Sequence, residues 1–379
     1  MKTAVWVRRL PWSIVAATVL LVGLGWIGIA RVEELTEGSG RFLHQQMAYS
    51  VIALAVMLLM TVFNYRVLGR LSYALFFLAA VLLVAVYDRP AINGAHRWIR
   101  FGPLGIQPSD LAKLAFILAL ARYLMYRDNY RRLRGLVAPL ALTLLPVFLI
   151  LKEPDLGTAL VFLPVFFVML FVAGAKRSDL ACMVLMGLLV LPLLWTQMSG
   201  DQKSRITALF DQPPPNRRPN DDTRQLYQAK QVRALGGVWG SLLTGQPTDD
   251  LAAYRLPEAE SDFIFSVLGE RLGLPGMAFV LCAFGLLVWG GVSIAVETRE
   301  PFGRLLVTGV VALLAVEVLI NTGMNVGLFP VKGSSLPLVS HGGSGLVVHA
   351  MAIGLLLNVG LRPGYEMANE PFRWTAERD

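Results

Sequence analysis

The stretch Pro257-Glu-Ala-Glu-Ser-Asp-Phe-Ile-Phe265 decides how the rest of the chain is interpreted, because three carboxylates are followed at once by a long apolar run. Glu258, Glu260 and Asp262 lie within five residues, and the apolar run continues from 263 to 296. A helix of this length and composition crosses a membrane, so the carboxylates are predicted to lie at a membrane surface. We expect Asp262 to carry the chemistry of the protein there, above a cavity that the remaining helices build.

The composition indicates a polytopic helical membrane protein. The chain has 379 residues, of which 55% are hydrophobic, and its mean hydropathy is +0.58. Apolar runs of about 20 residues recur along it, the length that spans a bilayer as a helix. The formal net charge of +8 is assigned to cytoplasmic loops rather than to nucleic-acid binding, because Lys and Arg fix topology. Cys182 and Cys282 lie in apolar runs and are interpreted as core residues without a disulfide.

We predict an all-α membrane protein of about ten transmembrane helices, forming a single domain over residues 1–379. The predicted spans are residues 12–30, 47–63, 71–87, 109–126, 136–151, 157–175, 180–198, 263–296, 305–322 and 345–360. Gly273, Pro275 and Gly276 interrupt the eighth span, so we expect its first part to be a surface or re-entrant segment.

The charges of the connections orient these helices. With the N-terminus in the cytoplasm, every cytoplasmic connection is basic and nearly free of acids, as the positive-inside rule requires. Both termini are then cytoplasmic, with a short tail at 361–379. Residues 199–262 form one large extracytoplasmic loop between spans seven and eight. Within it, apolar residues at helical spacing over 223–235 predict a short amphipathic helix on the outer surface.

Two outward-facing segments contain charged residues close to predicted spans. In Gln107-Pro-Ser-Asp-Leu-Ala-Lys113, Ser109 or Asp110 can cap the fourth span, and Lys113 faces Asp110 at i,i+3. Lys113 is either half of an interfacial ion pair or part of a functional cavity. In the turn 152–157, Glu153 and Asp155 either bind a cation or an amino group, or only shape the turn.

Two further segments complete the predicted outer site. Asp262 is interpreted both as a catalytic group and as the N-cap of the helix that follows, and the two roles are compatible. Between residues 321 and 345, glycines allow backbone amides to approach an anion, and a lysine adds positive charge. Glu317 and His349, inside spans nine and ten, are interpreted as buried hydrogen-bonded contacts between helices.

With these motifs in view, the chain resembles the SEDS family, the RodA and FtsW proteins of shape, elongation, division and sporulation. The resemblance covers essentially the whole membrane part, and its motifs occur in the same order. They are Gly94-Ala-His-Arg-Trp98, Gln107-Pro-Ser-Asp-Leu-Ala-Lys113, Glu153-Pro-Asp-Leu-Gly-Thr158, Leu256-Pro-Glu-Ala-Glu-Ser-Asp-Phe-Ile-Phe265, Gly269-Glu-Arg-Leu-Gly273, Asn325-Val-Gly-Leu-Phe-Pro330 and Ser340-His-Gly-Gly-Ser344.

The resemblance implies a peptidoglycan glycosyltransferase that polymerises lipid II at the outer face of the bacterial cytoplasmic membrane. Its implied partners are lipid II, the growing glycan strand, membrane lipid and a class B penicillin-binding protein. The implied catalytic residue is Asp262. The residues expected to bind substrate are Arg97, Trp98, Arg100, Asp110, Lys113, Glu153, Asp155, Glu258, Lys332, Ser340, Gly342, Gly343 and Ser344.

Three questions stay open at this point. A lipid II flippase and a noncatalytic scaffold for a penicillin-binding protein are the alternative functions. No cofactor is certain, although a divalent cation, Mg²⁺ or Mn²⁺, held by Asp155 would suit the diphosphate of the substrate. The chain also departs from the family, because Asp110 replaces a Glu, Glu260-Ser-Asp262 replaces His-Thr-Asp, and His341 replaces a Tyr.

Overall fold

The structure, a computed structural model of the chain, describes residues 10–36, 38, 40–89, 97–101, 104–127, 133–153, 155–197, 200–210, 221–331 and 333–362. Its α-helices are α2 (Trp12–Leu35), α3 (Arg41–Val62), α4 (Tyr65–Ala85), α5 (Pro108–Tyr126), α6 (Val137–Lys152), α7 (Leu156–Ala173), α8 (Arg177–Gln197), α9 (Gly200–Phe210), α10 (Asp221–Leu235), α11 (Ser241–Thr244), α12 (Ile264–Glu297), α13 (Pro301–Val326) and α14 (Gly343–Gly360).

The remaining elements are short. Three 3₁₀ turns lie at η1 (Val86–Asp88), η3 (Leu133–Leu136) and η4 (Leu251–Tyr254). The strands β1 (Ile99–Phe101) and β2 (Leu104–Ile106) form an antiparallel hairpin in which Ile99 pairs with Ile106. This hairpin is an addition to the predicted all-α class.

A long helix occupies each of the ten positions predicted as spans. In the described residues, eight of them are long and apolar enough to cross a membrane, which makes the chain a multi-pass membrane protein. The other two, α5 and α8, are not in this set, so the count of ten crossings stays a prediction. In α5 the apolar face carries Asp110 and Lys113 in the first turns, because this end of the helix lines a polar cavity.

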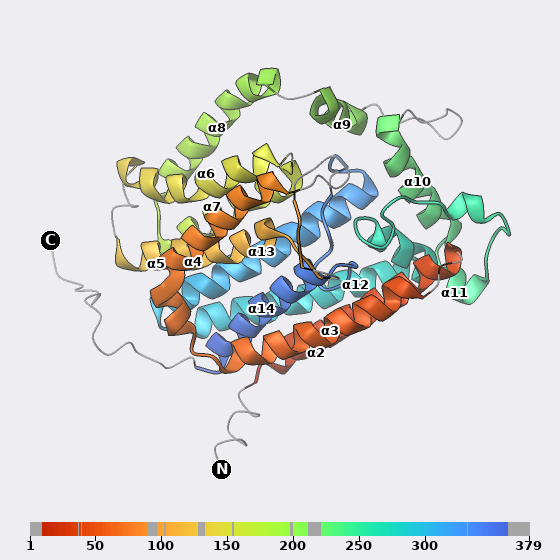
Figure 1. Cartoon of the computed structure of the whole chain (residues 1–379), viewed down its shortest axis with the longest axis horizontal. Coiled ribbons are helices and arrows are strands. Elements are labelled where there is room, and N and C mark those ends of the chain that lie inside the picture. The colour runs from red at the N-terminus through yellow and green to blue at the C-terminus, as the bar shows by residue number, and fades with distance from the viewer. Residues whose placement is uncertain are drawn as a thin grey trace, which may run out of the picture.

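The bundle is built around α13 and α14, which lie at its centre in Figure 1. In each of them, 72% of the apolar segment is buried inside the protein, compared with 22% in α3. The peripheral helices keep large apolar side chains exposed, as in Leu58 and Leu59 of α3 and Phe77 of α4. Exposed apolar side chains of this kind face lipid in a membrane protein, so burial separates the central helices from the lipid-facing ones.

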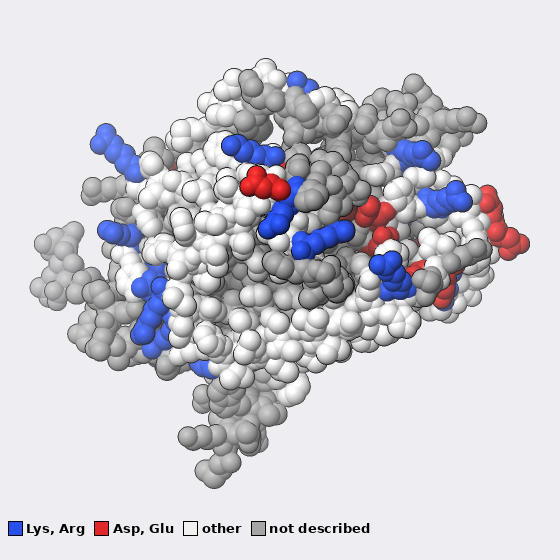
Figure 2. All heavy atoms as spheres, viewed as in Figure 1, with Lys and Arg blue, Asp and Glu red and all other residues white. Residues whose placement is uncertain are grey.

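The two ends of the bundle differ in charge. At one end, the beginning of α2 meets the end of α14, because Pro11 lies beside Gly360. Arg362, which follows α14, donates to the carbonyl oxygens of Thr61 and Val62 at the end of α3, which places its positive charge at this end. Figure 2 shows Lys and Arg at the left edge of the molecule and most of the visible acids further to the right.

Helices α10 and α11 pack over the other end of the bundle, against α12. A helix is confirmed over the predicted residues as α10, and its apolar residues Leu226, Ala229 and Val232 are buried against the protein, whereas its location at the outer membrane surface stays a prediction. The predicted interruption of the eighth span is also confirmed, because α12 bends at Gly273, where φ is 69°. A Cβ atom there would lie 2.2 Å from the carbonyl oxygen of Val238, so only glycine allows this close approach.

Candidate active site

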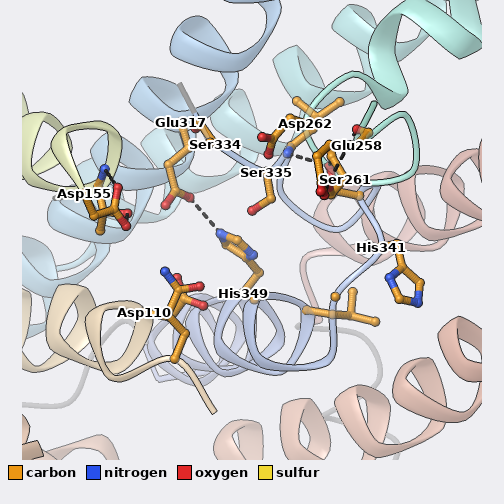
Figure 3. A pocket seen from close by; sticks show the side chains of 18 of the residues that line it. Asp110, Asp155, Glu258, Ser261, Asp262, Glu317, Ser334, Ser335, His341 and His349 are labelled. Carbon is orange, nitrogen blue, oxygen red and sulfur yellow. Dashed lines mark hydrogen bonds and ion pairs between the residues drawn. The ribbon is translucent and has the colours of Figure 1, made fainter. Parts of the chain in front are cut away.

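A cavity of about 440 Å³ opens at this covered end of the bundle. Its walls come from the segments before and within α5 and α7, from the loop before α12, and from α13 and α14. Figure 3 shows Asp262, Ser261 and Glu258 on one side, with Asp110, Glu317 and His349 on another. The volume lies within the roughly 300–1,000 Å³ that ligand pockets occupy. Residues far apart in the sequence therefore form one polar chamber inside an apolar bundle.

Asp262 lies in a turn whose shape is set by Glu258. The carbonyl oxygen of Glu258 accepts hydrogen bonds from the backbone amides of Ser261, Asp262 and Phe263, and Glu258 itself has φ of 54°. The N-cap of α12 is Phe263, and no side chain caps this helix. The predicted N-cap role of Asp262 is therefore wrong: the turn directs its carboxylate into the cavity instead of back onto the helix amides.

The surroundings of Asp262 favour its neutral form. Burial is the largest cause, and the carboxylates of Glu258, Asp155 and Glu260 add to it, whereas the guanidinium of Arg97 opposes them. Together they raise the pKa of Asp262 from 3.8 to about 7. Burial likewise raises the pKa of Glu260. A carboxyl group with a pKa near the working pH exchanges protons readily, which is the property of a general base.

A second cluster of charges lies deeper, between α5, α13 and α14. Lys113 Nζ is 2.6 Å from Glu317 Oε1 and 2.9 Å from Asp110 Oδ1, and His349 Nε2 is 2.7 Å from Glu317 Oε2. Ser344 Oγ donates to Asp110 and accepts from the backbone amide of Gln107. The i,i+3 pair of Asp110 and Lys113 and the buried contact of Glu317 with His349 confirm both sequence interpretations.

The balance of charge in this cluster weakens the attraction of Lys113 for further anions. Its ammonium group is buried and contacts two carboxylates, which offset its single positive charge. A cation that is already paired in this way attracts an incoming anion less than an exposed one does. The cluster fixes the wall of the cavity through Asp110 and Lys113, and its charge balance makes Lys113 a weaker site for an anion than an unpaired cation would be.

Arg97 and Trp98 enter the cavity from the segment before the β-hairpin. Arg97 Nε donates to the carbonyl oxygen of Glu153 at 3.1 Å, which fixes the arginine beside the turn before α7. Its guanidinium lies close to Asp262, since both side chains border the same point beside Gly333. A Cβ atom added to Gly333 would lie at that point, 3.5 Å from Asp262 Oδ2 and 4.0 Å from Arg97 Nη1. The ring of Trp98 packs over Gly105 of β2. The hairpin thus holds one cation and one aromatic ring at the cavity mouth.

The turn before α7 confirms the turn-shaping role predicted for Asp155, whereas ligand binding there stays a prediction. Asp155 is the N-cap of α7 and accepts hydrogen bonds from the backbone amide and the hydroxyl group of Thr158, and it also lines the cavity. Glu153 is buried, and neither of its carboxylate oxygens has a hydrogen-bond partner among the described residues. Burial and the nearby Asp155 raise the pKa of Glu153 to about 8. The neutral form of Glu153 is therefore favoured at pH 7.

Most residues expected to bind substrate lie in the cavity wall. Those that line it, beside the catalytic candidate Asp262, are Arg97, Trp98, Asp110, Lys113, Asp155, Glu258, Ser340 and Gly342. Arg100 is exposed on β1, and Glu153, Gly343 and Ser344 lie behind the lining. Lys332 falls outside the described residues. The expectation that Ser109 or Asp110 caps α5 is wrong, because the N-cap is Gln107, Pro108 occupies the first turn and no side chain caps the helix.

Some lining residues were missed. Gln225 of α10 reaches the cavity from the outer loop, and Ser334 and Ser335 line it beside Asp262. Nothing in their spacing marks them, because each is a common residue of a loop or of a surface helix. Glu317 and His349 were expected only as helix contacts, yet both also line the cavity. The sequence did hold a signal for these two residues, because an ionisable residue inside a predicted span indicates a functional site.

The acids of the cavity do not form a preformed metal centre. Within the part of the chain that the structure describes, no three His, Cys, Asp or Glu side chains are arranged to hold a metal ion. Asp155 accepts one hydrogen bond from Thr158 on each carboxylate oxygen, and binding of a divalent cation by Asp155 stays a prediction. We therefore derive no step through a divalent cation.

Taken together, the fold and the cavity define a class of protein: a multi-pass helical membrane protein with an acidic chamber at one end of its bundle. The comparisons with known proteins give the family. The family described as Cell cycle protein, which comprises FtsW, RodA and SpoVE, matches residues 9–362, and the chain belongs to it.

Named relatives cover most of the chain. It is 35% identical over 328 residues to the probable peptidoglycan glycosyltransferase FtsW of Geobacter metallireducens, covering 85% of each chain. It is 32% identical over 359 residues to stage V sporulation protein E of Bacillus subtilis, covering 91% of this chain and 95% of the relative.

Solved structures share the fold. One, reported under the words "Structural coordination of polymerization and crosslinking by a peptidoglycan synthase complex", has a TM-score of 0.77 at 30% identity, covering 92% of this chain and 97% of that one. RodA of Thermus thermophilus has a TM-score of 0.69 at 29% identity, covering 94% of this chain and 98% of that one.

Proposed function

We propose that this protein is a peptidoglycan glycosyltransferase that polymerises lipid II into glycan strands for cell shape or division. The observation that carries the proposal is the carboxyl group of Asp262, held in the wall of a polar cavity with a pKa of about 7. The names of the similar proteins support the reaction class.

In the proposed reaction Asp262 is the general base. The 4-hydroxyl group of an N-acetylglucosamine attacks the anomeric carbon of a chain linked to undecaprenyl diphosphate. The new C–O bond forms while the bond to the diphosphate breaks, with inversion at the anomeric carbon. The hydroxyl proton passes to Asp262, and the bonding electrons leave with the diphosphate. A positioned base of suitable pKa contributes roughly 10²–10⁴-fold to such a step.

Among the residues that the structure describes, Arg97 is the cation best placed to stabilise the departing diphosphate. It lines the cavity next to Asp262, whereas Lys113 is paired with two carboxylates deeper in the bundle. A planar guanidinium also matches the geometry of phosphate oxygens. Trp98, beside it, offers an apolar face against which a sugar ring packs. In this arrangement the acceptor hydroxyl lies near Asp262 and the leaving group near Arg97.

The orientation in the membrane follows from charge. Basic residues at the end opposite the cavity favour a cytoplasmic location for that end, so the cavity faces the outside of the cytoplasmic membrane. Both termini are then cytoplasmic, and the segment from α9 to Asp262 is extracytoplasmic. A class B penicillin-binding protein is the proposed partner, in keeping with the synthase complex to which one similar solved chain belongs.

Polymerisation of labelled lipid II by the purified protein, followed on gels across pH 5.5–8.5, tests this function. Since Asp262 must be ionised to accept a proton, the rate should rise through pH 7 and reach a plateau above it. Absence of glycan ladders, with a cognate penicillin-binding protein present, would refute the transferase and favour the flippase or the scaffold. Movement of labelled lipid II across vesicle membranes would then separate these two.

A further inference from the structure

Three consecutive carbonyl groups of the catalytic turn are held by residues from the last third of the chain. The carbonyl oxygen of Glu260 accepts from the backbone amide of His341 at 2.8 Å. That of Ser261 accepts from the hydroxyl group of Ser340 at 2.5 Å. The carbonyl oxygen of Asp262 accepts from two asparagine side chains of α13. The backbone of the turn is therefore fixed at Glu260, Ser261 and Asp262 by donors that lie outside the turn.

Asn321 and Asn325 lie one helical turn apart on α13, so their amides point to the same side. Asn321 Nδ2 is 2.9 Å from the carbonyl oxygen of Asp262, and Asn325 Nδ2 is 3.1 Å from it. Both side chains are fully buried. A buried carbonyl group that loses its donors is left without a hydrogen-bond partner, which is unfavourable, so these bonds oppose movement of the turn.

Further contacts fix the two amides themselves. Asn325 Oδ1 accepts from the hydroxyl group of Ser266 in the first turn of α12, which sets the orientation of its amide. Asn321 Nδ2 also donates to the carbonyl oxygen of Ser334, in the loop that lines the cavity. From the outer loop, Arg233 of α10 donates to the backbone carbonyl of Asn325 at 2.9 Å. The two asparagines thus link α10, α12 and the cavity loop to one carbonyl group.

We propose that Asn321 and Asn325 are positioning residues for Asp262, which hold its backbone so that its carboxylate meets the acceptor hydroxyl group; this inference rests on the proposed function. Neither amide lines the cavity, so neither is expected to touch the substrate. Their effect is on the placement of the base, and displacement of a catalytic group by about 1 Å costs about 10²-fold in rate.

The variants Asn321→Ala, Asn325→Ala and the double substitution test the proposal, with Asn358→Ala as the matched control. Asn358 is also a buried asparagine whose amide donates to two backbone carbonyls, those of Met60 and Phe63, but it lies at the opposite end of the bundle. It reproduces the loss of buried hydrogen bonds without touching the turn of Asp262.

In Asn325→Ala and the double variant, kcat for lipid II polymerisation should fall roughly 10- to 100-fold, while KM stays near that of the wild type. A looser turn admits water to Asp262, so the rising limb of the pH–rate profile should move below pH 7. Asn358→Ala should keep the wild-type profile per folded molecule, even if it unfolds at a lower temperature.

Hydrogen exchange gives a readout that needs no catalysis. The amides of Ser261, Asp262 and Phe263 should exchange faster in Asn325→Ala than in Asn358→Ala or the wild type. Folded variants whose kcat, pH profile and local exchange match Asn358→Ala would overturn the positioning role. If the wild type fails to polymerise lipid II, the proposed function fails, whereas the exchange experiment still decides whether the asparagines hold the turn.

Discussion

Asp262→Asn is predicted to abolish polymerisation and, at pH 8, to stabilise the folded protein. The environment raises the pKa of this carboxyl group from 3.8 to about 7. A raised pKa contributes stability below the unfolded-state value, and this contribution is lost as pH rises through the folded-state value. The raised pKa therefore costs the wild type on the order of 4 kcal/mol at pH 8 and about 2 kcal/mol at pH 5, where the carboxyl group ionises in the unfolded chain only. The neutral amide avoids this cost.

The assay is thermal unfolding of the purified variant and the wild type in one detergent, at pH 5 and at pH 8. The variant should unfold at a higher temperature at both values, and the difference should be larger at pH 8. Asp249→Asn, which neutralises an exposed carboxylate of the same outer loop, serves as the control and should change neither midpoint. A variant no more stable than the wild type at pH 8, or one stabilised equally at both values, would refute the raised pKa.

Three further substitutions have defined outcomes. Glu317→Ala leaves a buried lysine and a buried histidine without their shared partner, and should cost about 3–5 kcal/mol in a chemical or thermal unfolding experiment. Gly273→Ala should cost about 1–3 kcal/mol because φ is 69° and a carbonyl oxygen occupies the space of its Cβ, whereas Gly285→Ala in the same helix meets no atom and should be neutral or stabilising. Arg97→Gln removes the charge that lowers the pKa of Asp262, so the rising limb of the pH–rate profile should shift above pH 7.

The helical architecture follows directly from the sequence. Apolar runs of the right length mark each long helix, since a bilayer leaves no other way to satisfy the backbone. The break at Gly273 was also predictable, because glycine and proline together interrupt a helix. What the apolar pattern does not give is which helices are central, because α13 and α14 are no more apolar than α7 yet are far more buried.

The site was predicted in part. Asp262 and Asp110 stand out as acids beside apolar runs, and both line the cavity. Their partners do not stand out: Asn321 and Asn325 act through backbone carbonyls sixty residues away in the chain. The N-cap interpretation of Asp262 failed because residues 258–263 close a turn on Glu258 before the helix begins. Contacts of the folded turn, and not the local helix-capping propensity of aspartate, therefore decide where the Asp262 carboxylate points.

The most direct test of the central claim is polymerisation of labelled lipid II by the wild type and by Asp262→Ala, each alone and with a cognate class B penicillin-binding protein. We predict glycan ladders from the wild type and a loss of at least about 10²-fold from a folded Asp262→Ala variant. Equal ladders from both would contradict the role of Asp262 and would move the search for the base to Glu258 and Asp155, which line the same cavity.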